Sequence, residues 1–293
     1  MTAAYANLLR HELQERNLTF SRKYGLPSQL SYGSAPVVVY EESGEVHGNF
    51  AQASYGQIRA NPQWARRLRK VHTSAKSSLP RADRRWCELD SCNSSDALLM
   101  NVFCYPGVCE SSAVLSMLGV EEAASPEFGF KARVPLTGER FDRTEVDLRL
   151  PGLLVEAKLT EADFQSKAKD VVEQYRDFRD VFIRRDLPQD SKKYEGYQLI
   201  RNVLAAHALQ TSFCVLCDAR RPDLIEQWYA VMRCVRSADL RLRCKVLTWQ
   251  ELSEVVPDEL REFLDEKYGI RPGPIEPYVF ECQRELHPIE SER

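Results

Sequence analysis

The chain has 293 residues, of which 43% are hydrophobic and 28% are charged, and its formal net charge at pH 7 is −3. These values are ordinary for a globular protein, and the total charge does not indicate a nucleic-acid-binding protein. No stretch approaches the roughly 20 apolar residues of a membrane helix, and the N-terminus resembles an amphipathic helix rather than a signal peptide. We therefore expect a cytoplasmic protein with no membrane partner.

Residues 1–85 are predicted to form an N-terminal extension with a basic segment. Residues 1–16 look helical, "APVVVYE" predicts a strand, and "PQWARRLRKVHTSAK" predicts a basic helix with Pro62 near its start. Between residues 59 and 85 there are nine Lys or Arg residues against one acid, with Trp64 among them and Trp86 just after. We predict nucleic-acid contacts at Arg66, Arg67, Arg69 and Lys70, with a solvated helix face as the alternative.

Residues 86–293 are predicted to form one domain. "NSSDALLMNVFC" predicts a helix capped by Ser94 or Ser95, and "ESSAVLSMLG" predicts a helix that ends at Gly119. Alternating residues predict strands in "EFGFKARVPL" and "TEVDLRL", and the apolar "GLLVEAKL" predicts a third. Residues 161–185 predict a charged helix. The remaining segments predict helices in "KKYEGYQLIRNVLAAHAL", "RPDLIEQWYAVMRCV" and "QELSEVVPDELREFLDEKYG", and strands in "TSFCVLCD" and "LRCKVLTW". The fold class is α/β, a mixed central sheet flanked by helices.

Three charged residues interrupt the apolar strands: Asp147, Glu156 and Lys158, in the pattern D-x8-E-x-K. Glu156 and Lys158 point to one face of their strand, and a hairpin turned at Pro151-Gly152 would place Asp147 near Glu156. Two carboxylates held close together would repel each other unless a divalent cation lay between them, and such oxygen ligands suit Mg²⁺ or Mn²⁺. A lysine beside them could act on the attacking water and on the charge of a phosphate. A surface hairpin with a cross-strand ion pair is the alternative.

This pattern resembles the core of the PD-(D/E)xK superfamily, the restriction-endonuclease-like nucleases, over roughly residues 93–250. The resemblance implies a restriction-endonuclease-like fold with Asp147, Glu156 and Lys158 as catalytic residues, and with Asp147 and Glu156 as ligands of Mg²⁺ or Mn²⁺. Val146 stands where many members have a proline. A glutamate on the first core helix would be Glu110 or Glu127.

Some members of the superfamily place a glutamine on a helix after the E-x-K strand, for which Gln198 and Gln174 both qualify. We choose Gln198 as the fourth catalytic residue because its helix is the more apolar.

The resemblance implies metal-dependent hydrolysis of DNA phosphodiester bonds, by an endonuclease in a prokaryotic defence, repair or mobile-element setting. RNA as substrate and a homodimer are compatible with it. The alternatives are a catalytically inactive nucleic-acid-binding protein and a protein-interaction module built on a nuclease fold.

Nine cysteines without an export signal indicate reduced thiols. Four of them, Cys87, Cys92, Cys104 and Cys109, follow a C-x4-C-x11-C-x4-C spacing that is wider than the usual C-x2-C pairs of zinc sites. We therefore expect neither a structural zinc ion nor an iron–sulfur cluster there.

Overall fold

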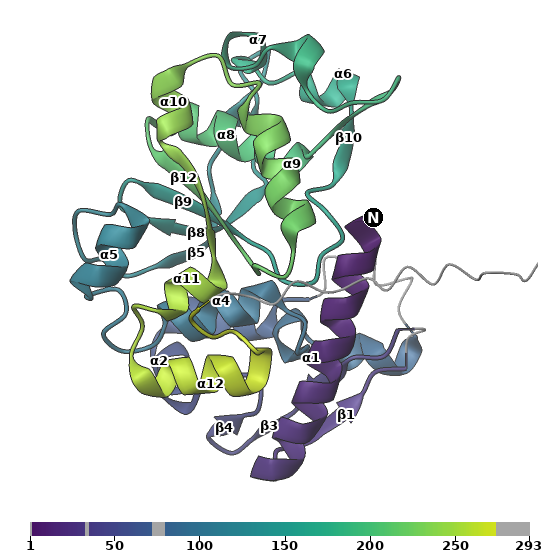
Figure 1. Cartoon of the computed structure of the whole chain (residues 1–293), viewed down its shortest axis with the longest axis vertical. Helices are drawn as coiled ribbons and strands as arrows, with labels where there is room; N and C mark the ends of the chain where they lie inside the picture. The colour runs from purple at the N-terminus through teal and green to yellow at the C-terminus, as the bar shows by residue number, and fades with distance from the viewer. Residues whose placement is uncertain (1, 33–34, 72–79, 274–293) are drawn as a thin grey trace, which may run out of the picture.

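The computed structural model describes residues 2–32, 35–71 and 80–273, and its centre is a five-stranded mixed sheet (Figure 1). The strand order is β13-β12-β9-β8-β5. The strands are β5 (Glu127–Lys131), β8 (Glu145–Leu150), β9 (Leu153–Ala157), β12 (Ser212–Cys217) and β13 (Cys244–Thr248). The pairs β5–β8 and β8–β9 are antiparallel, whereas β12 runs parallel to both β9 and β13. Gly152, with φ of 70°, makes the predicted turn between β8 and β9.

Helices cover both faces of the sheet (Figure 1). One core contains residues of α8 (Tyr197–Leu209) and α9 (Pro222–Met232), and the other contains residues of α4 (Ser95–Phe103), α5 (Ser112–Leu118), α11 (Trp249–Ser253) and α12 (Asp258–Tyr268). Successive residues of β9 enter the two cores in turn, since Leu154 packs in the first while Leu153 and Val155 pack in the second. Burial on both faces explains why this strand is apolar almost throughout.

The N-terminal segment packs onto the same domain. Helix α1 (Thr2–Tyr24) lies against α12, and Leu9 and Leu13 of α1 share a core with Val155 of the central sheet. The domain boundary that we placed after residue 85 stays a prediction.

Shorter elements complete the fold. In the first third of the chain these are β1 (Ser28–Leu30), β2 (Val38–Tyr40), β3 (Glu42–Ser43), β4 (Val46–His47), α2 (Gln52–Ala60), α3 (Pro62–Ala65), η1 (Arg66–Arg69), η2 (Arg81–Arg85) and η3 (Glu88–Asp90). Further on they are β6 (Val134–Pro135), β7 (Phe141–Asp142), β10 (Ser166–Ala168), α6 (Lys169–Val172), α7 (Phe178–Val181), η4 (Arg184–Asp186), β11 (Lys193–Glu195) and α10 (Ala238–Leu242). No helix among the described residues is long and apolar enough to span a membrane.

Helices with clear end signals form as predicted. Ser94 caps α4, because its hydroxyl accepts a hydrogen bond from the amide of Ala97, and α5 ends at Gly119 with φ of 63°. All five strands of the central sheet lie in segments that were predicted as strands.

Two predicted helices are wrong. The basic helix over residues 62–76 becomes the short α3 and the 3-10 turn η1, after which Val71 forms a β-bridge with Cys87; residues 72–79 lie outside the described part. The charged helix over residues 161–185 is replaced by β10, α6, α7 and η4 with intervening loops. Gln165 has φ of 61°, which a right-handed helix does not tolerate, and the Asp163 carboxylate accepts the amide hydrogen of Gln165 in a local turn.

Two element bounds also differ from the prediction. Helix α1 continues to Tyr24 rather than stopping near residue 16, and α8 begins only at Tyr197 because Gly196 has φ of 67° and residues 193–195 pair with β10.

Candidate active site

Two carboxylates face each other across the β8–β9 hairpin. The strand register pairs Leu148 with Val155, and its continuation by one residue brings Asp147 opposite Glu156. Asp147 Oδ2 accepts a hydrogen bond of 2.8 Å from the backbone amide of Ala157, which holds this carboxylate at the end of β9. The hairpin therefore brings Asp147 and Glu156 close together, as its sequence predicts.

Glu156 is buried and held from several sides. Its Oε1 accepts hydrogen bonds of 2.7 Å from Lys158 Nζ and from Gln198 Nε2, and its Oε2 accepts one of 2.7 Å from Asn202 Nδ2. Arg201 Nη2 lies 3.6 Å from Oε2. Gln198, Arg201 and Asn202 stand three and four residues apart on α8, so one face of this helix supplies all three contacts.

The pKa values of the two carboxyl groups are shifted in opposite directions. Burial, together with repulsion from Glu156 and Asp96, raises the pKa of Asp147 well above its usual value. Burial would raise the pKa of Glu156 as well, but the charges of Lys158 and Arg201 and the hydrogen bonds to this carboxylate lower it. Glu156 is thus ionised, and the ionisation of Asp147 beside it costs free energy.

Lys158 lies one residue beyond β9 rather than within it, and its amide still donates to the carbonyl of Leu216. Its ammonium group is buried. Burial would lower the pKa of Lys158, but attraction to Glu156, Glu161 and Asp147 raises it. The side chain therefore carries its charge in the metal-free protein.

Asp96, which was not among the predicted residues, is the acidic side chain that the first core helix directs toward this site. It lies in the first turn of α4, is 5% exposed, and repels the charge of Asp147. Two cations hold it: Arg67 Nη2 at 2.8 Å and Lys70 Nζ at 2.5 Å. The clearest signal in the sequence is an Asp in the first turn of a helix whose cap, Ser94, was predicted.

The glutamate candidates for this position lie elsewhere. Glu110 is exposed before α5, and Glu127 is exposed on β5 with its carboxylate 3.5 Å from Arg149. Gln174, the alternative to Gln198, accepts a hydrogen bond from Arg140, whereas Gln198 contacts Glu156 directly.

The four predicted nucleic-acid-binding residues divide into two pairs. Arg66 and Arg69 are exposed. Arg67 bridges Asp96 and Glu145, and Lys70 bridges Asp96 and Glu88. A side-chain carbon at Gly129 would clash with Arg67 Nη1, so the glycine of β5 leaves room for this guanidinium.

The four cysteines of the predicted spacing lie in different surroundings. Cys92 packs with Phe20 and Tyr40, Cys104 packs with Phe50 and Ile58, Cys109 belongs to the core around β9, and Cys87 is half-buried beside η3. Burial raises the pKa of Cys92 to about 11 and that of Cys109 to about 12, so these thiols are protonated.

The residues at the hairpin fit a divalent cation in their chemistry. Among the residues that the structure describes, no group of three or more His, Cys, Asp and Glu side chains is arranged to hold a metal ion, so a cation here would rest on Asp147, Glu156 and neutral oxygen atoms. Gln198 Oε1 is such an atom, since it is buried and has no hydrogen-bond partner. Bound positive charge would also relieve the repulsion that raises the pKa of Asp147.

The family model described as Restriction Endonuclease associating with ARP matches residues 22–269. The chain belongs to this family. No curated protein and no solved structure matches the chain. The mixed sheet with helices on both faces is consistent with a restriction-endonuclease-like fold, and membership of this family points to a nuclease.

Proposed function

We propose that this member of the Restriction Endonuclease associating with ARP family hydrolyses phosphodiester bonds of DNA with Mg²⁺ or Mn²⁺ bound at Asp147 and Glu156. The observation that carries the proposal is the pairing of these two carboxylates across β8 and β9, with a buried charged lysine beside them. Two facing carboxylates are costly in a protein without a cation, and Asp147, with its raised pKa, bears that cost. This arrangement resembles that of the PD-(D/E)xK superfamily, in which Asp147, Glu156 and Lys158 would take the three positions of the motif.

The side chains around Glu156 give each predicted catalytic residue a distinct task. Gln198 and Asn202 fix both oxygens of the Glu156 carboxylate, while the free Oε1 of Gln198 can accept a hydrogen bond from a water molecule. Lys158 is already charged, so it stabilises negative charge that develops on the phosphate rather than removing a proton from water. When bound, the cation would polarise the phosphate and lower the pKa of the attacking water.

The DNA backbone would be held by exposed basic residues near this site. Arg66 and Arg69 extend from the turn whose other cations, Arg67 and Lys70, bind Asp96. Replacing the exposed pair should flatten the salt dependence of DNA binding by about one unit of slope per lost phosphate contact.

Metal-dependent cleavage tests the proposal. We expect the purified protein to cut plasmid or linear DNA with Mg²⁺ or Mn²⁺, and excess chelator to stop the reaction. Asp147→Asn should abolish cleavage, whereas Asp239→Asn, which changes an exposed aspartate of α10, should leave it unchanged. DNA binding without metal-dependent cleavage would instead indicate a catalytically inactive nucleic-acid-binding protein.

A further inference from the structure

A cavity of about 650 Å³ lies beside η4 and the segment that follows α9, and its wall is rich in arginine. The described residues that line it are Ile183, Gln189 and three arginines, Arg184, Arg185 and Arg236. No acidic side chain belongs to this described lining. Guanidinium groups that surround one cavity repel each other, so the wall favours a ligand with negative charge.

Two of these arginines are held in place by the protein. Arg184 Nε donates to the hydroxyl of Tyr194 at 3.0 Å, and its Nη2 lies 2.9 Å from the carboxylate of Glu173. Arg236 Nε donates to two backbone carbonyls in and just after α7, each at 3.2 Å. The Nη atoms of Arg236 form no hydrogen bond or ion pair within the part of the chain that the structure describes. Guanidinium groups fixed in this way lose little conformational entropy when they bind a phosphate.

The third arginine, Arg185, is open to solvent. Its side chain is 88% exposed, and its Nε lies 3.5 Å from the carboxylate of Asp186, which is 50% exposed. Glu173, the acid beside Arg184, is only 19% exposed and is already engaged in that pair. An exposed ion pair contributes little free energy, so a phosphate group can take the place of Asp186 at Arg185.

Lysine side chains on and just after β10 continue the positive charge from this cavity. The ammonium of Lys169 lies 5.4 Å from the centre of the Tyr194 ring, whose hydroxyl accepts from Arg184. The ammonium of Lys167 lies 5.6 Å from the centre of the Tyr197 ring. Lys167 is exposed and Lys169 is half-buried. The two lysines therefore extend the cationic surface from Tyr194 to Tyr197.

This row of cations ends beside the candidate active site. Tyr197 is the first residue of α8, and the next residue, Gln198, donates a hydrogen bond to Glu156. Charge of one sign thus extends from the cavity to the β8–β9 hairpin. We call this row the cationic track, and its members are Lys167, Lys169, Arg184, Arg185 and Arg236.

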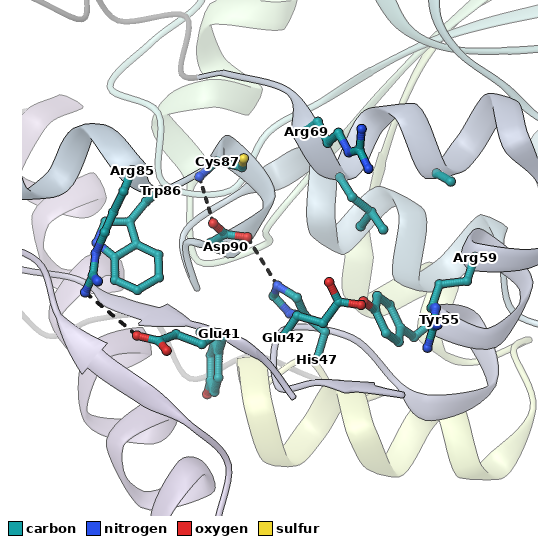
Figure 2. A pocket seen from close by; sticks show the side chains of 13 residues that line it. Glu41, Glu42, His47, Tyr55, Arg59, Arg69, Arg85, Trp86, Cys87 and Asp90 are labelled. Atoms are coloured by element: carbon teal, nitrogen blue, oxygen red, sulfur yellow. Dashed lines mark hydrogen bonds and ion pairs between the residues drawn. The ribbon is translucent and has the colours of Figure 1, made fainter. Parts of the chain in front are cut away.

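A polar cavity in the N-terminal third of the chain has a more balanced wall. Figure 2 shows acidic side chains there, with Glu41 beside Arg85 and Asp90 beside His47. A phosphate group that entered this cavity would meet carboxylates as well as cations. The cationic track is therefore the better fit for a polyanion.

We propose that the cationic track binds the phosphate backbone of a nucleic acid whose scissile bond lies at the β8–β9 hairpin. The position of the scissile bond rests on the proposed nuclease function, whereas the binding of the backbone does not. A row of separate cations fits a ligand that repeats its charge, and each strand of DNA carries one phosphate per about 3.4 Å of helix axis. Inorganic phosphate or a single acidic side chain would meet only one part of the track.

DNA binding in the presence of excess chelator tests the proposal without any cleavage. Fluorescence anisotropy of a labelled duplex, measured with the full chain at several salt concentrations, gives the slope of log affinity against log salt. We expect the double variant Lys167→Ala with Arg185→Ala to flatten this slope by about two units, one for each lost phosphate contact, and Arg185→Ala alone to flatten it by about one. The melting temperature should stay close to that of the wild type, because both side chains are exposed.

Two further double variants are matched controls. Arg22→Ala with Arg271→Ala removes two exposed arginines that do not belong to the track, and it should keep the wild-type slope. Lys167→Arg with Arg185→Lys keeps both charges and should also bind like the wild type, because the salt dependence follows charge. Inorganic phosphate and polyglutamate serve as competitors. We expect neither to displace the labelled duplex as well as unlabelled DNA does.

An unchanged salt slope in the alanine double variant would overturn the proposal, and so would a wild-type protein that binds no duplex. Displacement by polyglutamate or by inorganic phosphate as effective as that by DNA would overturn it as well, since the ligand would then be an acidic protein or a free anion. A protein that binds DNA through the track but does not cut it contradicts only the proposed function. A protein that cuts DNA with Mg²⁺, and whose alanine double variant keeps the wild-type slope, contradicts only the track.

Discussion

At the scale of single residues, the raised pKa of Asp147 determines how this residue affects the stability of the fold. Its folded pKa lies above that of an unfolded chain, so the folded state binds more protons, and stability falls as pH rises from the ordinary range of an aspartate to the folded pKa. A folded pKa that lies one pH unit above the unfolded value lowers the free energy of unfolding by about 1.4 kcal/mol across that window. Asp147, which we propose as a ligand of the metal, thus opposes folding when no metal is present.

Asp147→Asn should therefore stabilise the metal-free protein and reduce the dependence of its stability on pH in the acidic range. Denaturant unfolding in the presence of chelator, across a series of acidic to neutral pH values, measures this. Adding Mg²⁺ should make the wild type the more stable of the two proteins, because only the wild type would gain stability from the ion. A metal-free Asp147→Asn protein that is less stable than the wild type at neutral pH would show that the two carboxylates do not repel each other.

At the scale of elements, one ion-pair network joins the short turn η1 to helix α4. Asp96 is its buried acid, with 6% of its side chain exposed, and Arg67 and Lys70 are its partners, with 14% and 21%. Removing one partner from a buried ion pair costs much more than losing an exposed pair, because charge remains buried without compensation.

Asp96→Asn should therefore destabilise the protein by about 2–4 kcal/mol, since it leaves two largely buried cations short of charge. Asp239→Asn breaks the pair of Asp239 with Arg243, in which the aspartate is 80% exposed, and should change stability by less than about 0.5 kcal/mol. Denaturant midpoints of the two variants give the comparison. Equal effects would mean that the network on α4 does not hold η1 in place.

Elements whose signals are local could be predicted from the sequence, and elements shaped by distant contacts could not. The Ser94 cap, the Gly119 end of α5 and the turn at Gly152 depend on a few neighbouring residues, and they form as predicted. The basic helix was wrong because Arg67 and Lys70 turn toward Asp96, a residue 26 or more positions away along the chain. The same separation along the chain explains why Asp96 was not predicted as a residue of the site. Glu156 and Lys158 were predicted because they stand two residues apart in one strand segment.

At the scale of the whole molecule, the two ends of the described chain meet around a buried lysine. Lys267 of α12 donates to the side chain of Asn17 in α1, and its ammonium lies 4.0 Å from the centre of the Tyr40 ring. Burial lowers the pKa of Lys267 from 10.5 to about 7. Nearby Cys92 does not titrate in the same range, because burial raises its pKa to about 11.

The sign of the effect on stability follows from this lowered pKa. At Lys267 the unfolded chain binds up to one more proton than the folded protein between about pH 7 and pH 10, so the contribution of this residue to stability should rise with pH across that window. Lys267→Met should remove this contribution, so the variant should be more stable than the wild type near pH 7. The difference between their free energies of unfolding should shrink as pH increases, by up to roughly 5 kcal/mol in total. Unfolding curves at several pH values measure the difference. Lys23→Met, which changes an exposed lysine of α1, is the control and should run parallel to the wild type. A constant difference between Lys267→Met and the wild type would show that Lys267 keeps an ordinary pKa.

The most direct test of the central claim, that the β8–β9 hairpin is a metal-dependent phosphodiesterase site, is plasmid cleavage in Mg²⁺ by Lys158→Ala. Gln198, Arg201 and Asn202 still hold Glu156 in this variant, so calorimetry should find Mg²⁺ binding largely retained. Cleavage should fall by about 100-fold or more, because the lost charge acts on the transition state. Lys131→Ala, which changes an exposed lysine on β5, should cut like the wild type. A folded Lys158→Ala protein that cuts DNA at the wild-type rate would contradict the claim.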